Sequence, residues 1–383
     1  MQTETFTYDA ATQSWSVASL PQLDSPDTFI LVFGSSHFYD IPQPIQDLYQ
    51  QYPQSHIIGC STSGEIHAGA ILDDSLSVAV TKLEKTTLKS ITLPLQSNSD
   101  IGDVTEQLAQ CLEAPSLRGV FLLGSGLNIN FASLIKKLQT RLGDEVIITG
   151  GVSGDGQKFE RTWVLADGIP TENSVSVIGF YGDAIQIGYG SQGGWEATGL
   201  PMLITKAKDN VLYKLNGLSA LNWYRFQMRE KDVPLPAGAL YHPLAIRPSV
   251  YSRDFVVRTI LGIDEENGGL IFAGEIPERS FAQFMTATKT QLVNGARSAA
   301  NVTNHKATNS DDVLSVAVSC VGRRLVMQDT TPLELQAVLD ILPSKTKQVG
   351  FYSYGEICPN YNSLDTASAL HNQTMTLTIF SEK

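Results

Sequence analysis

Residues 57–66 read Ile57-Ile58-Gly59-Cys60-Ser61-Thr62-Ser63-Gly64-Glu65-Ile66, an apolar segment followed by small hydroxyl residues and then Gly-Glu. The same order returns at residues 349–357, which read Val349-Gly350-Phe351-Tyr352-Ser353-Tyr354-Gly355-Glu356-Ile357. Between the two, an apolar segment ends in Gly150-Gly151-Val152-Ser153-Gly154-Asp155-Gly156. Glycine permits positive φ and lets a ligand or another backbone approach closely. Each segment is therefore predicted to be a strand whose end presents hydroxyls and one carboxylate.

The surroundings of these three segments repeat as well. Each is preceded by a predicted strand and then a predicted helix, the strands at 28–34, 119–124 and 313–320 and the helices at 41–52, 131–142 and 332–342. Such a unit cannot bury its own apolar face, so the copies must pack on one another. The sequence therefore predicts an α/β fold of mixed sheets with covering helices, organised as two pseudo-equivalent halves built from a repeated strand-helix-strand-Gly-acid unit.

The chain has 383 residues, a length that favours two domains. Composition changes where five glycines surround Trp195 and Pro201 follows, between residues 188 and 201. The predicted organisation is an extended lead-in at 1–24, an N-terminal half at 25–195 and a C-terminal half at 196–383. Trp195 is expected to anchor the interface between the halves. A helix is predicted over 279–299.

Composition and charge exclude several classes of protein. The formal net charge is −12, which argues against nucleic-acid binding because that function requires a basic face. The sequence contains no apolar run of about 18 residues, so no membrane span is expected. The first residues lack the features of a signal peptide, and the 4 cysteines have no Cys-x-x-Cys spacing. These features predict a cytoplasmic protein with free thiols.

The sequence offers no complete catalytic motif. Residues 59–63 approach the Gly-x-Ser-x-Gly elbow, but Ser63 stands where the second glycine belongs. Cys60 paired with a distant histidine, or Ser61, could serve a thiol or serine hydrolase, and this class is kept as an alternative. The prediction is a binding protein rather than an enzyme. Glu65, Asp155 and Glu356 could bind a ligand or accept backbone N–H bonds at the strand ends, and the sequence leaves both roles open.

Several of these motifs are similar to the FIST sensory family, named for F-box and intracellular signal transduction proteins. Residues 59–66 and 150–156 resemble its N-terminal signatures. The C-terminal half is similar at Ser319-Cys320-Val321-Gly322-Arg323, at residues 350–357 and at His371-Asn372-Gln373-Thr374. The resemblance covers nearly the whole chain. It implies a sensor that binds a small ligand and reports it to a signalling partner.

The ends of equivalent repeats are expected to lie together and to form the ligand pocket. Arg323 is a candidate counter-ion for an anionic ligand, with an ion pair to Glu356 as the alternative. The predicted ligand-binding residues are Cys60, Ser61, Thr62, Ser63, Gly64, Glu65, Gly150, Gly151, Gly154, Asp155, Arg323, Tyr354, Gly355, Glu356 and Asn372.

The chain resembles in particular the stand-alone, nitric-oxide-sensing haem proteins of this family, which act on a separate histidine kinase. This implies haem b as cofactor, nitric oxide as signal and a histidine kinase or another output protein as partner in trans. A haem needs one protein ligand on its proximal side, and His371 is favoured over His37 and His67. The alternative is a FIST sensor of an amino acid or another small metabolite without haem.

Overall fold

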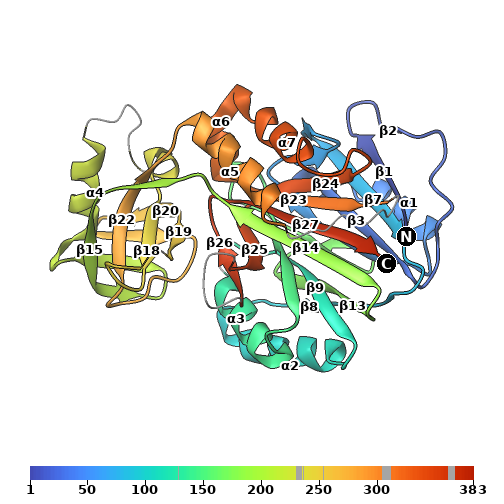
Figure 1. Cartoon of the computed structure of the whole chain (residues 1–383), viewed down its shortest axis with the longest axis horizontal. Helices are drawn as coiled ribbons and strands as arrows, with labels where there is room; N and C mark the ends of the chain where they lie inside the picture. The colour runs from blue at the N-terminus through green and yellow to red at the C-terminus, as the bar shows by residue number, and fades with distance from the viewer. Residues whose placement is uncertain (128, 230–234, 236, 253, 304–311, 361–366) are drawn as a thin grey trace.

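The computed structural model describes residues 1–127, 129–229, 235, 237–252, 254–303, 312–360 and 367–383. Three mixed sheets form a core, and an antiparallel sheet forms a smaller subdomain that stands at one side of it (Figure 1). The predicted α/β architecture of mixed sheets with covering helices is confirmed in the core. None of the helices in the described ranges is long and apolar enough to cross a membrane.

The three core sheets share one arrangement of four strands. The first sheet has the order β4 (His56–Thr62), β3 (Thr28–Ser35), β7 (Ser75–Lys82), β1 (Gln2–Asp9). The second has the order β10 (Ile147–Val152), β9 (Leu117–Gly124), β13 (Ser174–Tyr181), β8 (Thr87–Pro94). The third has the order β24 (Lys347–Ser353), β23 (Leu314–Cys320), β27 (Met375–Glu382), β14 (Ile185–Gln192).

In each unit the first two strands of this order are parallel and the others antiparallel. The parallel strands are connected through helices, namely α1 (Gln43–Gln51) in the first unit, α3 (Phe131–Leu142) in the second, and α6 (Val321–Met327) with α7 (Pro332–Leu339) in the third. The described strands of the core therefore form three equivalent units, and two equivalent halves are not seen among the described residues.

A short hairpin leaves each unit and pairs with the sheet of another. Strand β5 of the hairpin β5 (Glu65–His67) and β6 (Ala70–Leu72) pairs with β24 of the third unit. Strand β11 of the hairpin β11 (Val164–Ala166) and β12 (Ile169–Thr171) pairs with β4 of the first. Strand β25 of the hairpin β25 (Gly355–Pro359) and β26 (Ser368–His371) pairs with β10 of the second. Gly64 and Gly355 therefore occupy equivalent positions, each at the start of an exchanged hairpin.

One glycine recurs at the same place in the three units, for one steric reason. A Cβ atom would lie 2.3 Å from the carbonyl oxygen of Val32 at Gly59, 1.9 Å from that of Leu122 at Gly150, and 1.9 Å from that of Ala317 at Gly350. In each case the obstacle is the backbone of the neighbouring parallel strand, which cannot rotate away as a side chain could. Only glycine fits this close approach.

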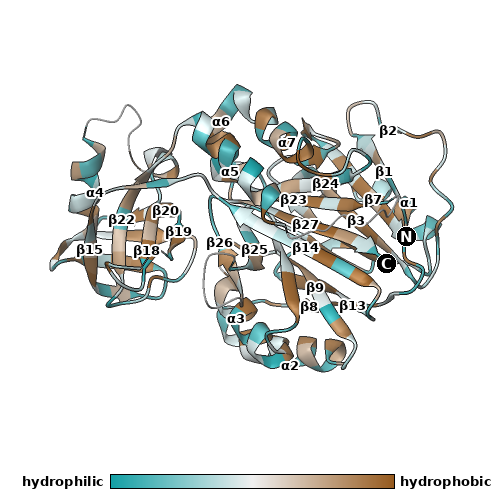
Figure 2. Ribbon diagram, in the orientation of Figure 1, coloured by the Kyte–Doolittle hydropathy of each residue, from teal (hydrophilic) through white to brown (hydrophobic). Residues whose placement is uncertain are grey.

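Aromatic side chains from all three units meet at the centre of the core. Phe33 stacks on Phe351 with ring centroids 4.8 Å apart, and Phe380 contacts Phe29 at 5.6 Å and Phe180 at 4.9 Å. All five rings are buried. Figure 2 shows hydrophobic residues concentrated on the core strands and hydrophilic residues on the exposed helix surfaces. The units therefore share one core, as the repeated pattern required.

The remaining elements cover the core sheets. Strand β2 (Ser14–Trp15) extends the first sheet beside β1. Helix α2 (Ile101–Leu112) buries Leu108 and Leu112, four residues apart, against the second unit. Asn130 caps α3 by accepting a hydrogen bond from the backbone N–H of Ser133. The short 3-10 turns of the core are η1 (Ser36–Tyr39), η2 (Asn98–Asp100) and η4 (Gln328–Thr330), while η3 (Ala237–Tyr241) lies in the subdomain.

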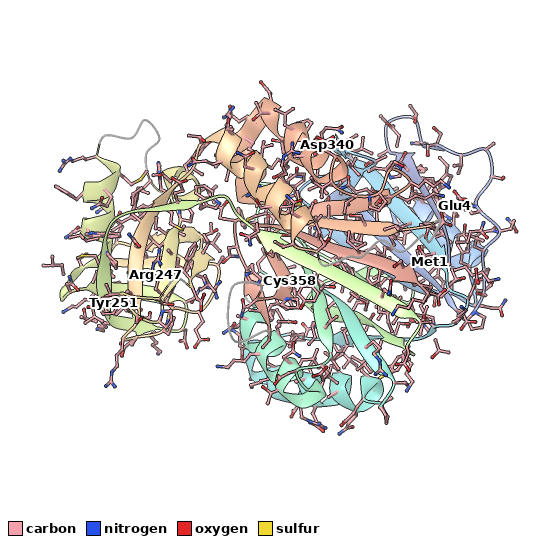
Figure 3. The ribbon with its side chains drawn as sticks, in the orientation of Figure 1. Met1, Glu4, Arg247, Tyr251, Asp340 and Cys358 are labelled. Atoms are coloured by element: carbon pink, nitrogen blue, oxygen red, sulfur yellow. The ribbon has the colours of Figure 1, made fainter. Side chains whose placement is uncertain are left out.

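The subdomain is inserted between β14 and α5 (Lys289–Asn301), so both of its connections lead to the third unit. Figure 3 marks Arg247 and Tyr251 in this subdomain and Cys358 on β25 of the core. Its elements are β15 (Glu196–Lys208), β16 (Val211–Leu215), β17 (Leu218–Ser219), α4 (Ala220–Met228), β18 (Leu244–Arg247), β19 (Val256–Arg258), β20 (Ile260–Asp264), β21 (Gly269–Phe272) and β22 (Phe281–Thr286).

The predicted boundary at residue 195 falls where the chain enters this subdomain at β15, but the chain later returns to the sheet that contains β14. The predicted helix over 279–299 is wrong in its first part. Residues 281–286 form β22, which pairs with β15 and β18, so tertiary pairing overrides the local pattern. The helix begins only after Thr288, which forms a capping box with Gln291.

We expect Gly350→Ala to lower the free energy of unfolding by about 3 kcal/mol or more, because its Cβ would collide with the carbonyl of Ala317. Gly102→Ala is the matched control. Gly102 is exposed in α2, and a Cβ added there would meet no atom within 4 Å, so this change should stabilise the protein by up to about 1 kcal/mol. Urea unfolding measures both changes, and similar effects for the two variants would contradict the steric explanation.

Candidate functional site

Two of the predicted carboxylates occupy equivalent buried positions. In Glu65, Oε2 accepts hydrogen bonds from the Ser75 backbone N–H at 3.1 Å and from its hydroxyl at 2.7 Å, while Oε1 accepts from the Thr62 hydroxyl. Glu65 and Glu356 are each at most 1% exposed. Because their oxygens already accept hydrogen bonds from the protein, these carboxyl groups hold the start of an exchanged hairpin in place and do not face a ligand.

Glu356 repeats this geometry in the third unit. Its Oε1 accepts from the Ser353 hydroxyl at 2.7 Å, and its Oε2 accepts from the Thr374 backbone N–H at 3.0 Å and from the Thr374 hydroxyl at 2.9 Å. Burial raises the pKa of Glu65 to about 8 and that of Glu356 to about 7, although the hydrogen bonds from these donors oppose the rise. A protonated Oε1 can donate to the hydroxyl beside it, so the same network also accommodates the neutral acid.

Asp155, the acidic residue of the middle repeat, has a different environment. Its carboxylate accepts three backbone N–H bonds, from Phe159 at 2.9 Å, Glu160 at 2.8 Å and Arg161 at 2.9 Å, and a further bond from the Tyr354 hydroxyl. The Tyr354 ring stacks on Phe159 with centroids 4.5 Å apart. Asp155 therefore shapes the loop after β10 and joins it to the turn of the third unit.

The ends of the three repeats lie together, although only some of the predicted ligand-binding residues at each end face solvent. The backbone N–H of Gly154 donates to the Ser61 carbonyl at 3.0 Å, and that of Gly156 donates to the Ser63 hydroxyl at 3.0 Å. Ser63 in turn donates its backbone N–H to the Tyr352 carbonyl at 2.8 Å. The first turn thus bridges the second and the third.

A polar groove of about 770 Å³ opens at this meeting point, between the core and the subdomain. We call it the polar groove. Ser63 and Asp155 are the predicted site residues that line it. Its lining comprises Ser63, Asp155, Gly156, Gln157, Lys158, Leu240, Tyr241, Val321, Arg324, Leu325, Gln328 and Asp329.

Sequence reasoning missed most of this lining. Tyr241 belongs to the subdomain, and no local signal connects it to the Gly-acid turns. Arg324 follows a predicted residue in the chain, but its own position carries no motif. It binds the Asp73 carboxylate through two nitrogens, at 2.8 and 2.6 Å, and donates to the Ser63 carbonyl at 2.6 Å. Lys158 and Asp329 are exposed and give the groove charges of both signs.

A smaller space adjoins the polar groove on the other side of Leu240 and Val321, which line both. Its volume is about 80 Å³ and its lining is mostly aliphatic and aromatic. We call it the apolar cavity. Tyr354 is the predicted site residue that lines it, beside Phe159 and Val152.

Arg323 lines neither space, which corrects its predicted role as a counter-ion. It is fully buried and pairs with Glu334 at 2.7 Å rather than with Glu356. Its remaining N–H groups donate to the carbonyls of Leu292 at 2.8 Å, Gln373 at 3.4 Å and Gly193. Glu334 also accepts from the hydroxyls of Ser319 and Tyr352, both at 2.9 Å. The pair is therefore saturated by protein groups.

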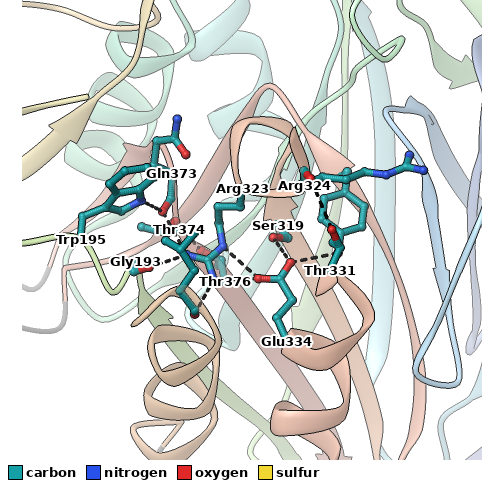
Figure 4. A network of polar contacts seen from close by, with 12 residues as sticks. Gly193, Trp195, Ser319, Arg323, Arg324, Thr331, Glu334, Gln373, Thr374 and Thr376 are labelled. Atoms are coloured by element: carbon teal, nitrogen blue, oxygen red, sulfur yellow. Dashed lines mark hydrogen bonds and ion pairs between the residues drawn. The ribbon is translucent and has the colours of Figure 1, made fainter. Parts of the chain in front are cut away.

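The same network anchors the subdomain. Trp195 donates its indole N–H to the Gln373 carbonyl at 3.0 Å, in the position that Figure 4 shows beside Arg323. Its ring packs in a cluster that combines Val257 and Met285 of the subdomain with Leu292 and Met327 of the core. Trp195 thus lies at the interface between the subdomain and the core, whereas the predicted interface was one between two halves.

The candidate nucleophiles are not presented to a substrate. Cys60 is buried on β4, and burial raises the pKa of its thiol well above the ordinary value. The Ser61 hydroxyl is buried and accepts a hydrogen bond from the backbone N–H of Trp163 at 3.0 Å. Asn372 is also buried, and its amide has no hydrogen-bond partner among the described residues. Gly64, Gly150, Gly151 and Gly355 serve the turns and strand pairings described above.

The histidines favoured for haem do not meet the requirements of a haem site. The Nε2 atom of His371 lies 3.0 Å from the Cys358 carbonyl, and burial lowers the pKa of this histidine to about 4. His67 contacts Ser77 at 3.2 Å, and His37 is exposed on η1. Neither the polar groove nor the apolar cavity is lined by a histidine in the described ranges. The apolar cavity is also smaller than the roughly 150 Å³ that holds a benzene.

We expect Glu334→Gln to destabilise the protein by about 3–5 kcal/mol, because it leaves the buried Arg323 charge without a counter-charge. The control is Asp183→Asn, which breaks the exposed ion pair with Arg118 and should cost less than about 1 kcal/mol. Urea unfolding compares the two. A cost for Glu334→Gln no larger than that of the control would contradict the assigned role of the buried pair.

The raised pKa values also predict a pH dependence. Between the ordinary pKa of 4.5 and about 8, folded Glu65 binds its proton more tightly than the unfolded chain does. The stability it contributes is therefore fully present below that range and is lost as the pH rises through it. The free energy of unfolding of the wild type minus that of Glu65→Gln should fall as the pH rises and should level off near pH 8. Urea unfolding of both proteins at a series of pH values measures this difference. For Glu356→Gln the difference should level off near pH 7. Differences that rise with pH would refute the assignment.

Two known protein-family models meet inside the subdomain, at the junction of β17 and α4. A model of the FIST N domain matches residues 28–218 and a model of the FIST C domain matches residues 220–359. No curated protein matches the chain. A solved structure, the cyanuric acid hydrolase from A. caulinodans, shares 13% identity over 78% of this chain and 99% of its own, with a TM-score of 0.19, a level that supports no argument about fold or function. The two domain models together cover most of the sequence, and the chain belongs to the FIST family of sensory signalling domains.

Proposed function

We propose that this FIST protein senses a small polar metabolite that binds in the polar groove. The observation that carries the proposal is the composition of the groove walls. Ser63 comes from the first unit, Asp155 and Lys158 from the second, Arg324 and Asp329 from the third, and Tyr241 from the subdomain. A ligand in this position contacts every part of the molecule at once. The groove volume of about 770 Å³ lies within the usual range for small-molecule sites.

The charges in the polar groove define the class of ligand. Lys158 supplies a flexible ammonium for a carboxylate or phosphate group, and Asp329 supplies a carboxylate for a cationic group. Tyr241 and Gln328 add neutral hydrogen-bonding groups to the lining. A metabolite that carries both charges, such as an amino acid, matches this set best. This favours the metabolite sensor over the haem sensor, which stays a prediction from the family resemblance.

The signalling step follows from the position of the groove between the core and the subdomain. A ligand that contacts both parts favours the arrangement in which both contacts are made, and this is how ligands shift conformational equilibria. We propose that a separate signalling protein, such as a histidine kinase, recognises this arrangement of core and subdomain. The resemblance to stand-alone members of the family supports that partner.

The proposal is tested by thermal unfolding in the presence of individual amino acids and short dicarboxylates. A ligand that binds only the folded state must raise the melting temperature as its concentration rises. Lys158→Gln should weaken binding of a carboxylate probe by about tenfold or more, because it removes a charge-assisted hydrogen bond. Lys137→Gln, an equally exposed change on α3, is the control and should leave the affinity unchanged.

Two results would count against the groove as the sensing site. The first is that none of these probes changes the melting temperature. The second is a probe that binds with the same affinity to the wild type, to Lys158→Gln and to Lys137→Gln, since that ligand would have to occupy another site.

A further inference from the structure

The subdomain holds a further pocket, separate from the polar groove and from the apolar cavity. Its volume is about 270 Å³, and it shares no lining residue with either of the other two spaces. It lies at the loop that joins β18 to β19, in the part of the subdomain where Figure 3 marks Arg247. Asn360, which follows β25, contributes to its lining from the core. We call it the Arg247 pocket.

Arg247 brings a positive charge to the wall of this pocket. Its guanidinium lies over the Phe255 ring, 4.9 Å from the ring centre, and Nη1 donates a hydrogen bond to the Ser252 carbonyl at 2.9 Å. These two contacts hold the guanidinium in place. Nε is covered by protein and Nη2 is not, and neither atom has a hydrogen-bond partner within the described ranges. Nη2 is therefore the group that can bind a ligand carboxylate.

Asp254 brings the opposite charge to the same pocket. Its backbone is held by Ser252, whose hydroxyl donates to the Asp254 carbonyl at 3.2 Å and accepts from the Asp254 N–H at 3.1 Å. The carboxylate forms no hydrogen bond and no ion pair in the part of the chain that the structure describes. Arg247 and Asp254 thus line one pocket without pairing with each other, and a ligand that carries both charges can bind between them.

The rest of the lining is mostly apolar and limits the size of the ligand. Ile246, Phe255 and Val256 are among the apolar residues. A cavity of roughly 150 Å³ holds benzene, so about 270 Å³ holds a molecule somewhat less than twice as large. Leucine is of this size, whereas tryptophan exceeds it.

We propose that the Arg247 pocket is a second ligand site, which binds a free α-amino acid with an aliphatic side chain, such as leucine. Arg247 binds the α-carboxylate, Asp254 binds the α-ammonium group, and the side chain contacts the apolar lining. A simple carboxylic acid leaves Asp254 without a partner and a simple amine leaves Arg247 without one, so the two charges together select the zwitterion. This site does not depend on the function proposed for the polar groove.

The first test uses the full chain with labelled methyl groups and leucine as the probe. Saturable shifts are expected in the NMR signals of Ile246 and Val256, which line the Arg247 pocket. Leu325 lines the polar groove and reports separately on binding there. Shifts confined to Leu325 would overturn this proposal while supporting the function proposed for the groove. Absence of saturable shifts at Ile246 and Val256 would overturn it in every case.

Two analogues of leucine test the recognition of each charge. 4-Methylpentanoate lacks the ammonium group, and 3-methylbutylamine lacks the carboxylate. Each should bind at least about tenfold more weakly than leucine, because a charge-assisted hydrogen bond is lost. An analogue that binds as tightly as leucine would refute the contact assigned to the group that it lacks.

Asp254→Asn separates recognition of the ammonium group from a general effect on the pocket. It should weaken binding of leucine by at least about tenfold and leave binding of 4-methylpentanoate unchanged or tighter, because that probe has no ammonium group to lose a partner. The carboxylate that it removes forms no bond to the described residues, so the fold should be retained. Equal weakening of both probes would contradict the role assigned to Asp254.

Arg247→Gln should weaken binding of leucine and of 4-methylpentanoate by at least about tenfold, and that of 3-methylbutylamine by less than about twofold. Arg225→Gln is the matched control, since Arg225 is an exposed arginine of the same subdomain that pairs with Glu265 on its surface. A loss in the control as large as that in Arg247→Gln would refute the proposal. If Arg247→Gln does not fold, because the bond to Ser252 is also lost, Asp254→Asn and the two analogues decide the question.

Discussion

The hydrogen bonds between each exchanged hairpin and the sheet of another unit are the constraint on which the rest of this structure depends. They join β5 to β24, β11 to β4 and β25 to β10. An open sheet edge exposes unpaired backbone groups and invites association with other chains. Here each unit closes an edge of another, so none of the three sheets is complete without a strand from a distant part of the sequence.

This exchange also decides where the Gly-acid turns lie. Each turn sits where the chain crosses from one sheet to another, so its first task is to hold the crossing strand. Glu65 and Glu356 do this with three hydrogen-bond donors each, which a buried carboxyl group requires. Because the crossings converge, Ser63 and Asp155 come to line a common groove. The structural function of the motif and its proposed ligand-binding function are thus divided among its residues.

The subdomain is attached to this core through a buried ion pair that spans its two connections. Arg323 donates to the carbonyls of Gly193, just before the subdomain, and of Leu292, just after it. A buried ion pair adds little net stability compared with apolar packing, but its fixed geometry specifies one arrangement of the groups around it. The polar groove and the apolar cavity both lie at the resulting boundary. In the proposed function, the orientation of the subdomain against the core is therefore the variable on which a ligand in the polar groove acts.

The sequence by itself determined most of the secondary structure, the repeat and the family. Alternating and helical hydrophobic patterns located most core strands and helices, and the glycines at 59, 150 and 350 marked the same close approach three times. Only the tertiary structure decided that the three units are not grouped into two equivalent halves, that their hairpins are exchanged, that Arg323 pairs with Glu334, and that Tyr241 joins Ser63 in one groove. Most of these features depend on contacts between residues far apart in the chain, and the Arg323–Glu334 pair depends on how two successive helices pack. Local periodicity fixes which face of a strand is buried, but it carries no information about which distant strand, charge or loop that face meets.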